Sequence, residues 1–154
     1  MNLRRQTVLV TAMSIVALAV TVAAQTPVHS DARGVAIDGY DPVAYFAVGE
    51  AQRGRADHAV EWNDAIWHFA STENAELFRG DPERYAPQFG GYCAWAAAQG
   101  YVAGVDPQAW TVHNGRLYLN FSAGVRRRFV RDLDGNIAAA ERNWPGLAAE
   151  LAVR

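Results

Sequence analysis

The 154-residue chain has no lysine and only one cysteine. All 14 basic residues are therefore arginine, which excludes a lysine Schiff base as a catalytic device. The net charge of −2 shows no basic excess and excludes a general nucleic-acid partner. The sequence contains neither a Gly-x-Ser-x-Gly elbow nor a phosphate-binding loop. Nothing in it therefore makes a positive case for an enzyme.

The first 24 residues are typical of a secretory signal peptide. A basic start precedes an uncharged run over residues 8–22, which is shorter than the about 20 apolar residues that span a bilayer. Small residues over 22–24 predict cleavage after Ala24, and an uncleaved membrane anchor is the alternative. We therefore expect an exported protein of the periplasm or cell envelope, with no stable membrane insertion after cleavage.

Cleavage would leave a mature chain without methionine, because Met1 and Met13 both lie in the removed part. This excludes a methionine-lined copper(I) site, so a soft-metal site must use cysteine, histidine or oxygen ligands. The remaining chain has the length of one domain. We expect a flexible segment over residues 25–33, the domain over residues 34–146, and a C-terminal tail over residues 147–154.

Two β-hairpins are predicted from alternating apolar residues around turn sequences. Strands over 59–62 and 66–69 form the first, and strands over 110–113 and 116–119 form the second. The second turn is Asn114-Gly115, the strongest local hairpin signal, because both turn positions need positive φ. With hairpins and helices present but no βαβ alternation, the expected class is α+β.

Each hairpin is followed by a serine that can cap a helix, Ser71 in one case and Ser122 in the other. The chain thus repeats a hairpin plus a capped helix, without a recognisable repeat in sequence. The alanine-rich helix after Gly91 is predicted to be buried at the centre of this small domain. Helices are predicted over residues 43–47, 72–79, 82–86, 92–99, 123–131 and 133–143, the last one closed by Trp144-Pro145.

The lone Cys93 is the strongest candidate for chemistry. Exported proteins usually pair their cysteines or have none, so a single thiol needs an explanation. If the helix begins at Gly91 or Tyr92, the thiol lies in its first turn, where free amides favour a thiolate. A thiolate can bind a soft metal, attack a substrate or be oxidised. The alternative is a buried small apolar side chain, the usual fate of an isolated cysteine.

Other candidate ligands are scattered through the sequence. His68 alternates with aromatic neighbours in a predicted strand, and no histidine has metal-ligand spacing. Tyr40 and Asp41 lie in a predicted turn and helix cap, while Tyr92 and Trp95 are the aromatic residues nearest Cys93 and could line a pocket. The cluster Arg126-Arg127-Arg128 indicates a solvated helix face, with a partner contact or an anionic surface as alternatives.

Several ordered motifs together resemble the exported branch of the YHS-domain family, over about residues 34–146. The segments that carry the resemblance are Gly39-Tyr40-Asp41-Pro42-Val43-Ala44-Tyr45-Phe46, Phe69-Ala70-Ser71-Thr72-Glu73-Asn74, Asp81-Pro82-Glu83-Arg84-Tyr85-Ala86-Pro87-Gln88-Phe89-Gly90-Gly91-Tyr92-Cys93-Ala94 and Gly115-Arg116-Leu117-Tyr118-Leu119-Asn120. The resemblance implies a small metal-associated module, found beside copper-transporting ATPases. Its relatives carry cysteines where this chain has Ala44 and Ala70, and this branch has Cys93 instead.

The leading hypothesis is an exported, non-enzymatic protein that binds or handles a metal ion through Cys93, with copper favoured by the resemblance. His68, a tyrosine or an aspartate would complete the ligand shell. One alternative is a thiol-based redox protein that uses Cys93. Another is a module that binds a small ligand or a protein, through residues such as Tyr40, Asp41, Tyr92 and Trp95, with Cys93 structural.

Overall fold

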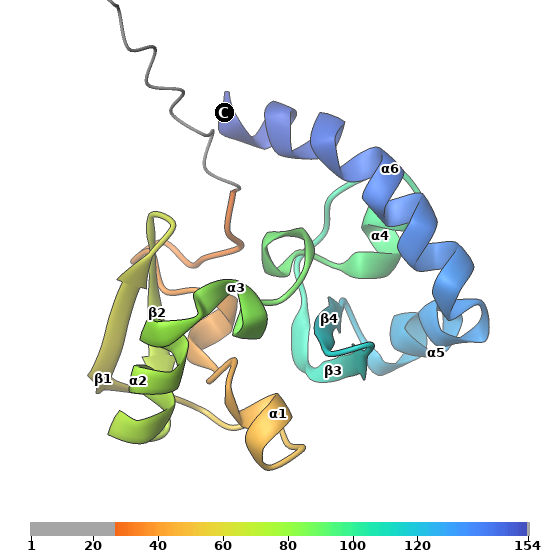
Figure 1. The fold of residues 1–154 in the computed structure, drawn as a ribbon. Helices are drawn as coiled ribbons and strands as arrows, with labels where there is room; N and C mark the ends of the chain where they lie inside the picture. Colours follow the sequence, from red (N-terminus) through yellow and green to blue (C-terminus); the bar gives the residue numbers. More distant parts are fainter. Residues whose placement is uncertain (1–26, 154) are drawn as a thin grey trace, which may run out of the picture.

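The first hairpin is closed by two residues in the left-handed conformation. The computed structural model describes residues 27–153 (Figure 1). Strand β1 (Arg55–Trp62) pairs antiparallel with β2 (Ala65–Phe69), and Asn63 and Asp64 between them have φ of 52° and 58°. Asparagine and aspartate tolerate this conformation better than most residues, and positive φ at both positions matches the twist of the flanking strands. The predicted first hairpin is confirmed.

The second hairpin uses the turn that the sequence indicates most strongly. Strand β3 (Asp106–His113) pairs antiparallel with β4 (Arg116–Asn120), and Asn114 and Gly115 have φ of 50° and 72°. Each hairpin is a separate two-stranded sheet. A two-stranded sheet is marginal by itself, so each hairpin depends on the helices packed against it.

Both predicted serine caps are present. Ser71 opens α2 (Thr72–Gly80) and Ser122 opens α5 (Ala123–Arg131). Each serine oxygen accepts the backbone N–H three residues further on, at 3.1 and 3.2 Å. This bond satisfies one of the free amides at the helix start. The α+β class and the two hairpin–helix units are therefore confirmed.

The last helix, α6 (Leu133–Ala152), is longer than predicted. The prediction of a stop before Trp144-Pro145 is wrong, as is the prediction of a separate tail over residues 147–154, because the helix continues past Pro145. Proline removes one hydrogen bond and disfavours a helix interior. Leu147, only 8% exposed, nevertheless packs with the core of the second half, and this burial favours the continued helix.

The alanine-rich helix α4 (Ala94–Ala98) is buried, as predicted. Its small side chains allow close approach of α6, with which it makes its main contact in the second half of the molecule. Its counterpart in the first half is the short helix α1 (Ala44–Ala47). Each of these two helices follows a turn of the same kind, so the repetition includes more than the hairpins and the helices after them.

These equivalent turns have an unusual backbone. η1 (Ile37–Gly39) precedes α1 with successive φ values of 42°, 55° and 76°, and η2 (Phe89–Gly91) precedes α4 with 56°, 60° and 81°. Three consecutive left-handed residues are rare outside glycine, and here they recur at matching places. We call residues 35–86 lobe one and residues 88–153 lobe two; Figure 1 shows them side by side.

The repetition also includes the second helix cap of each lobe. Asp81 caps α3 (Pro82–Tyr85) with φ −154° and ψ 74°, and Asp132 caps α6 with φ −139° and ψ 70°. The two aspartates are 51 positions apart, as are Ser71 and Ser122. The lobes are therefore two copies of one architecture: left-handed turn, short helix, hairpin, capped helix and second capped helix.

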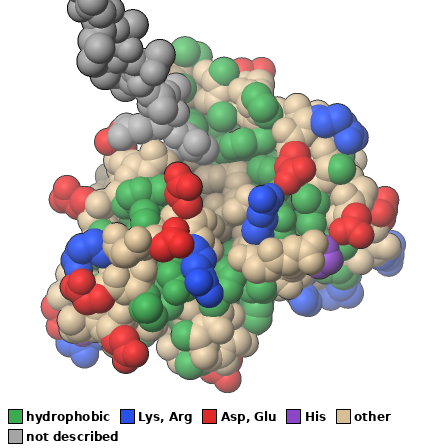
Figure 2. All heavy atoms as spheres, viewed as in Figure 1, with side chains coloured by type: hydrophobic (Ala, Val, Ile, Leu, Met, Phe, Trp, Pro, Cys, Tyr) green, Lys and Arg blue, Asp and Glu red, His purple; other side chains and the backbone are tan. Residues whose placement is uncertain are grey.

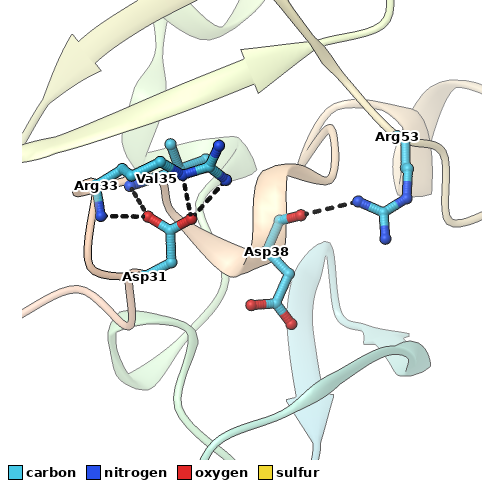
Figure 3. A network of polar contacts seen from close by, with 5 residues as sticks. All are labelled: Asp31, Arg33, Val35, Asp38 and Arg53. Atoms are coloured by element: carbon cyan, nitrogen blue, oxygen red, sulfur yellow. Dashed lines mark hydrogen bonds and ion pairs between the residues drawn. The ribbon is translucent and has the colours of Figure 1, made fainter.

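Residues 27–34 are part of the fold, in contrast to the flexible segment predicted over residues 25–33, whose first two residues lie outside the described ones. His29 donates its backbone N–H to Gly90 O at 2.8 Å and accepts from Ile37 N at 3.0 Å. Asp31 forms a tight turn, in which its carboxylate accepts from the Arg33 side chain and from Val35 N (Figure 3). The predicted signal peptide lies outside the described residues.

The lobes are joined through β4 and one tyrosine. Leu117 and Leu119 of β4 are fully buried in the same apolar cluster as Trp67 and Phe78 of lobe one. A second cluster surrounds α4, α5 and α6. Tyr45 of lobe one donates its hydroxyl to Pro107 O of lobe two at 2.9 Å, and burial raises its pKa above the usual value.

Candidate functional site

Cys93 lies just before α4 as its N-cap and is 1% exposed. Its Sγ accepts from Phe121 N at 3.3 Å and from Ala96 N at 3.5 Å. The thiol also points at Asn120 Oδ1, 3.8 Å away. The sulfur is therefore enclosed, and its polar neighbours use it as a hydrogen-bonding group.

The repeated architecture explains this arrangement. Asp41 occupies the equivalent place in lobe one, two residues after Gly39, as Cys93 is two residues after Gly91. Asp41 is fully buried, and its carboxylate accepts from Val43 N at 2.8 Å and from Ala70 N at 2.8 Å.

The partners of the two side chains correspond as well. Ala70 follows the last residue of β2, and Phe121 follows the last residue of β4, so both side chains bind the amide just beyond a hairpin. Asp41 has an additional partner in Asn74 Nδ2 at 2.7 Å. Cys93 thus performs in lobe two the structural task that a carboxylate performs in lobe one.

The described residues do not fit a copper centre at Cys93. Two N–H donors point at its sulfur, and these are groups that a metal ion would have to displace. His68 belongs to β2 of lobe one, where its ring lies against Gly39, whereas the bonding partners of Cys93 all belong to lobe two. Across residues 27–153, no three His, Cys, Asp or Glu side chains are grouped to hold a metal ion.

The predicted aromatic ligands have separate environments. Tyr40 is covered by the Arg53 guanidinium, whose central carbon lies 4.8 Å from the ring centroid, and Arg128 lies 5.6 Å from the Trp95 centroid. Both are cation–π contacts within the protein. The structure therefore does not bring Tyr40, Asp41 and Trp95 together into one site with Cys93.

Tyr92 contacts aromatic rings of the leading segment and of α6. Its ring packs between those of His29, at 5.1 Å, and Trp144, at 6.0 Å. Burial lowers the pKa of His29, and the Asp38 carboxylate partly opposes that effect. These contacts lead to the edge of a cleft that the sequence alone did not indicate.

This cleft of about 760 Å³ lies between the lobes, and its volume is within the range of small-molecule sites. Figure 2 shows the region between the lobes as a hollow with hydrophobic and neutral surface, flanked by charged side chains. Its aromatic lining comes from both lobes: Trp62 and Trp67 from the first hairpin, and Phe89 and Trp144 from lobe two. The remaining lining residues are Val28, Asn63, Glu83, Ala86, Pro87, Gln88, Gly90, Glu141 and Pro145.

The aromatic rings form connected pairs along the cleft. The centroids of Trp62 and Trp67 are 5.9 Å apart, and those of Phe89 and Trp144 are 5.8 Å apart. Trp67 donates its indole N–H to Trp62 O at 3.0 Å, which fixes one ring against the hairpin. Trp62 and Trp144 are half-buried, so they still present apolar surface to the cleft.

The charged residues of the lining are both acidic. Glu83 is exposed at the start of α3, and Glu141 lies on α6. Arg116 approaches Glu141 to 3.3 Å, but no arginine is among the lining residues. The cleft therefore combines aromatic surface with the Glu83 carboxylate and with a Glu141 carboxylate that is paired to Arg116.

A scan against protein-family models and searches of curated proteins and of solved structures find nothing that matches the chain. The resemblance to the YHS family stays a prediction. Within residues 27–153, no helix combines the length and apolarity needed to span a membrane.

Proposed function

We propose that this protein is a non-enzymatic binding module that takes a small organic cation in the cleft between its lobes. The observation that carries the proposal is the composition of the lining: aromatic residues from both lobes, two carboxylates and no basic side chain. Aromatic faces attract cations through their quadrupole, most strongly where water is excluded. Glu83 adds attraction of the same sign, whereas the charge of Glu141 is partly offset by its ion pair with Arg116.

The proposal gives Cys93 a structural role. A thiol that is 1% exposed and already bonded to two amides is poorly placed to meet a metal ion or an oxidant. Export to the periplasm or cell envelope, and membership of the YHS family, remain part of the proposal on the strength of the sequence motifs. Copper binding through Cys93 and His68 is less well supported, because their environments lie in different lobes.

Calorimetric titration with choline tests the proposed ligand class. We expect saturable binding of choline, and roughly tenfold weaker binding of its uncharged isostere 3,3-dimethylbutan-1-ol, because only the cation gains the aromatic and carboxylate attraction. Trp144→Leu and Glu83→Gln should each weaken choline binding. The matched control is Trp95→Leu, an aromatic replacement on α4 outside the cleft.

Three results would each overturn the proposal. One is the absence of heat with choline, and another is equal affinity for the uncharged isostere. The third is a loss of choline binding in Trp95→Leu as large as that in Trp144→Leu. Near-ultraviolet circular dichroism of each variant confirms that the fold is retained before it is titrated.

A further inference from the structure

Helix α5 has a charge pattern that the cleft does not explain. It carries Arg126, Arg127, Arg128 and Arg131 within nine residues, and it has no acidic residue. Elsewhere in residues 27–153, four arginines are paired with carboxylates: Arg33, Arg55, Arg79 and Arg116. No arginine of α5 belongs to an ion pair in that part of the chain.

Two of the four arginines have structural tasks. Arg126 Nε donates to Trp110 O at 2.5 Å and to Thr111 Oγ1 at 3.1 Å, which ties α5 to β3. Arg128 lies over Trp95. Arg127 and Arg131 are exposed and lie one turn apart, where like charges disfavour a helix.

The equivalent helix of lobe one shows that the fold does not require these charges. Counting 51 positions back, Glu76 of α2 corresponds to Arg127, and Gly80 corresponds to Arg131. The buried residue between them is phenylalanine in both lobes, fully buried as Phe129 in α5. The core side of the helix is thus the same, while its outer face has changed from mixed charge to positive.

Exposed apolar side chains accompany the positive face. Phe121, just before the Ser122 cap, is 59% exposed, and Val130 is 38% exposed. A shallow recess of about 300 Å³ between Ser122 and Arg131 is lined by Arg127, among others. In Figure 2 basic side chains follow the lower right edge of the molecule, where Figure 1 places α5.

We propose that the outer face of α5 is a docking surface for an anionic lipid membrane. Arginines would contact lipid phosphates, and Phe121 would enter the region between headgroups and acyl chains, the arrangement used by peripheral anchors. The net charge of the whole chain is −2, so such binding would depend on this one face. This surface is independent of the proposed cation cleft.

Vesicle sedimentation tests the proposal with the full chain. We expect binding to vesicles that contain phosphatidylglycerol, little binding to pure phosphatidylcholine, and release at high salt. The double variant Arg127→Gln/Arg131→Gln should bind more weakly by about fivefold per arginine, and Phe121→Ala should also weaken binding. The matched control Arg55→Gln/Arg79→Gln removes two exposed arginines from lobe one.

Residues 1–24 are the same in every variant, so differences between variants report on the α5 face. Equal losses of vesicle binding in the α5 variant and in the lobe-one control would overturn the proposal. Equal binding to charged and to neutral vesicles would overturn it as well. Competition by millimolar inorganic phosphate, with no effect of Phe121→Ala, would overturn it in favour of a free-oxyanion site.

Discussion

A carboxylate and a thiol accept hydrogen bonds from equivalent backbone amides in the two lobes. The Asp41 carboxylate accepts from Ala44 N at the start of α1 and from the amide after β2, while Cys93 caps α4 and binds the amide after β4. A buried N–H without a partner costs about 1–3 kcal/mol, so each position needs an acceptor. Backbone hydrogen bonding thus accounts for a sulfur acceptor at this position.

Cys93 should therefore behave as a buried cap in solution. We expect a small aromatic disulfide reagent to label the native thiol at least about a hundredfold more slowly than the unfolded one, since the native chain must open first. Cys93→Ala should lower the free energy of unfolding in urea by about 1–3 kcal/mol, because two amides lose their acceptor.

An exposed thiol in the same protein provides the reference for this rate. Ala123→Cys, made in the Cys93→Ala background, places a thiol on the exposed start of α5 and should react rapidly. If native Cys93 reacts as fast as that reference, the structural role is wrong and the thiol-chemistry hypothesis gains support.

Among the elements, the segment before Val35 contains a turn that is held by the Asp31 carboxylate. The Asp31 carboxylate accepts from Val35 N and from the Arg33 guanidinium, and these bonds lower its pKa from 3.8 to about 2. Close to this turn, the backbone of His29 bonds Ile37 of η1 and Gly90 of η2 and so connects both lobes. A short polar stretch can thus be ordered by hydrogen bonds that no hydrophobic pattern reveals.

The contribution of this turn should depend on pH in a defined direction. Because the folded pKa of Asp31 is below its unfolded value of 3.8, its stabilisation is full above pH 3.8 and is lost as pH falls toward about 2. Asp31→Asn should therefore be less stable than the parent at neutral pH, with the difference disappearing near pH 2. Urea midpoints of both proteins across this range measure the effect.

Asp64→Asn is the control for that comparison, because asparagine suits the left-handed turn position at residue 64. Its urea midpoints are measured across the same pH range as the reference for a substitution outside the Asp31 turn. A constant difference for Asp31→Asn across the same range would contradict the proposed hydrogen bonding.

The molecule as a whole is organised around the joint between two copies of one architecture. Gly90 is at this joint, with φ of 60°, and a Cβ there would lie 1.9 Å from Pro27 O and 3.5 Å from Trp144 Cζ2. The backbone conformation favours glycine, and the lack of space requires it. The same joint forms one wall of the cleft.

Gly90→Ala should therefore lower the free energy of unfolding by more than the strain of a left-handed alanine alone. Gly115→Ala is the matched control, because Gly115 has φ of 72° and no atom within 4 Å of its added Cβ. We expect Gly115→Ala to lower the free energy of unfolding by about 1–2 kcal/mol, the usual cost of a left-handed alanine. Gly90→Ala should lower it by about 3 kcal/mol or more, since a backbone contact must also move.

Urea denaturation of the two variants provides the comparison. Equal losses would show that the contact between Gly90 and the leading segment does not contribute to the joint. In that case the aromatic packing of Phe89 with Trp144 would still support the wall of the cleft.

Local chemistry in the sequence determined the hairpins, the serine caps and the burial of the alanine-rich helix. Asn114-Gly115 favours one type of tight hairpin turn. Ser71 and Ser122 each bond a backbone N–H only three residues further along the chain. These signals need no distant partner, so they can be recognised in one dimension. Local propensity failed at Pro145, because burial of Leu147 beyond it outweighed the proline.

The cleft and the role of Cys93 depend on contacts between distant segments. Trp62, Glu83, Phe89 and Trp144 belong to four separate stretches, and each is an ordinary core or surface residue until the lobes pack together. Cys93 likewise lies at a helix start that could have faced solvent, and only the amide of Phe121, 28 positions later, shows that it is enclosed. Side-chain type limits what a residue can do, while long-range packing sets its exposure and its partners.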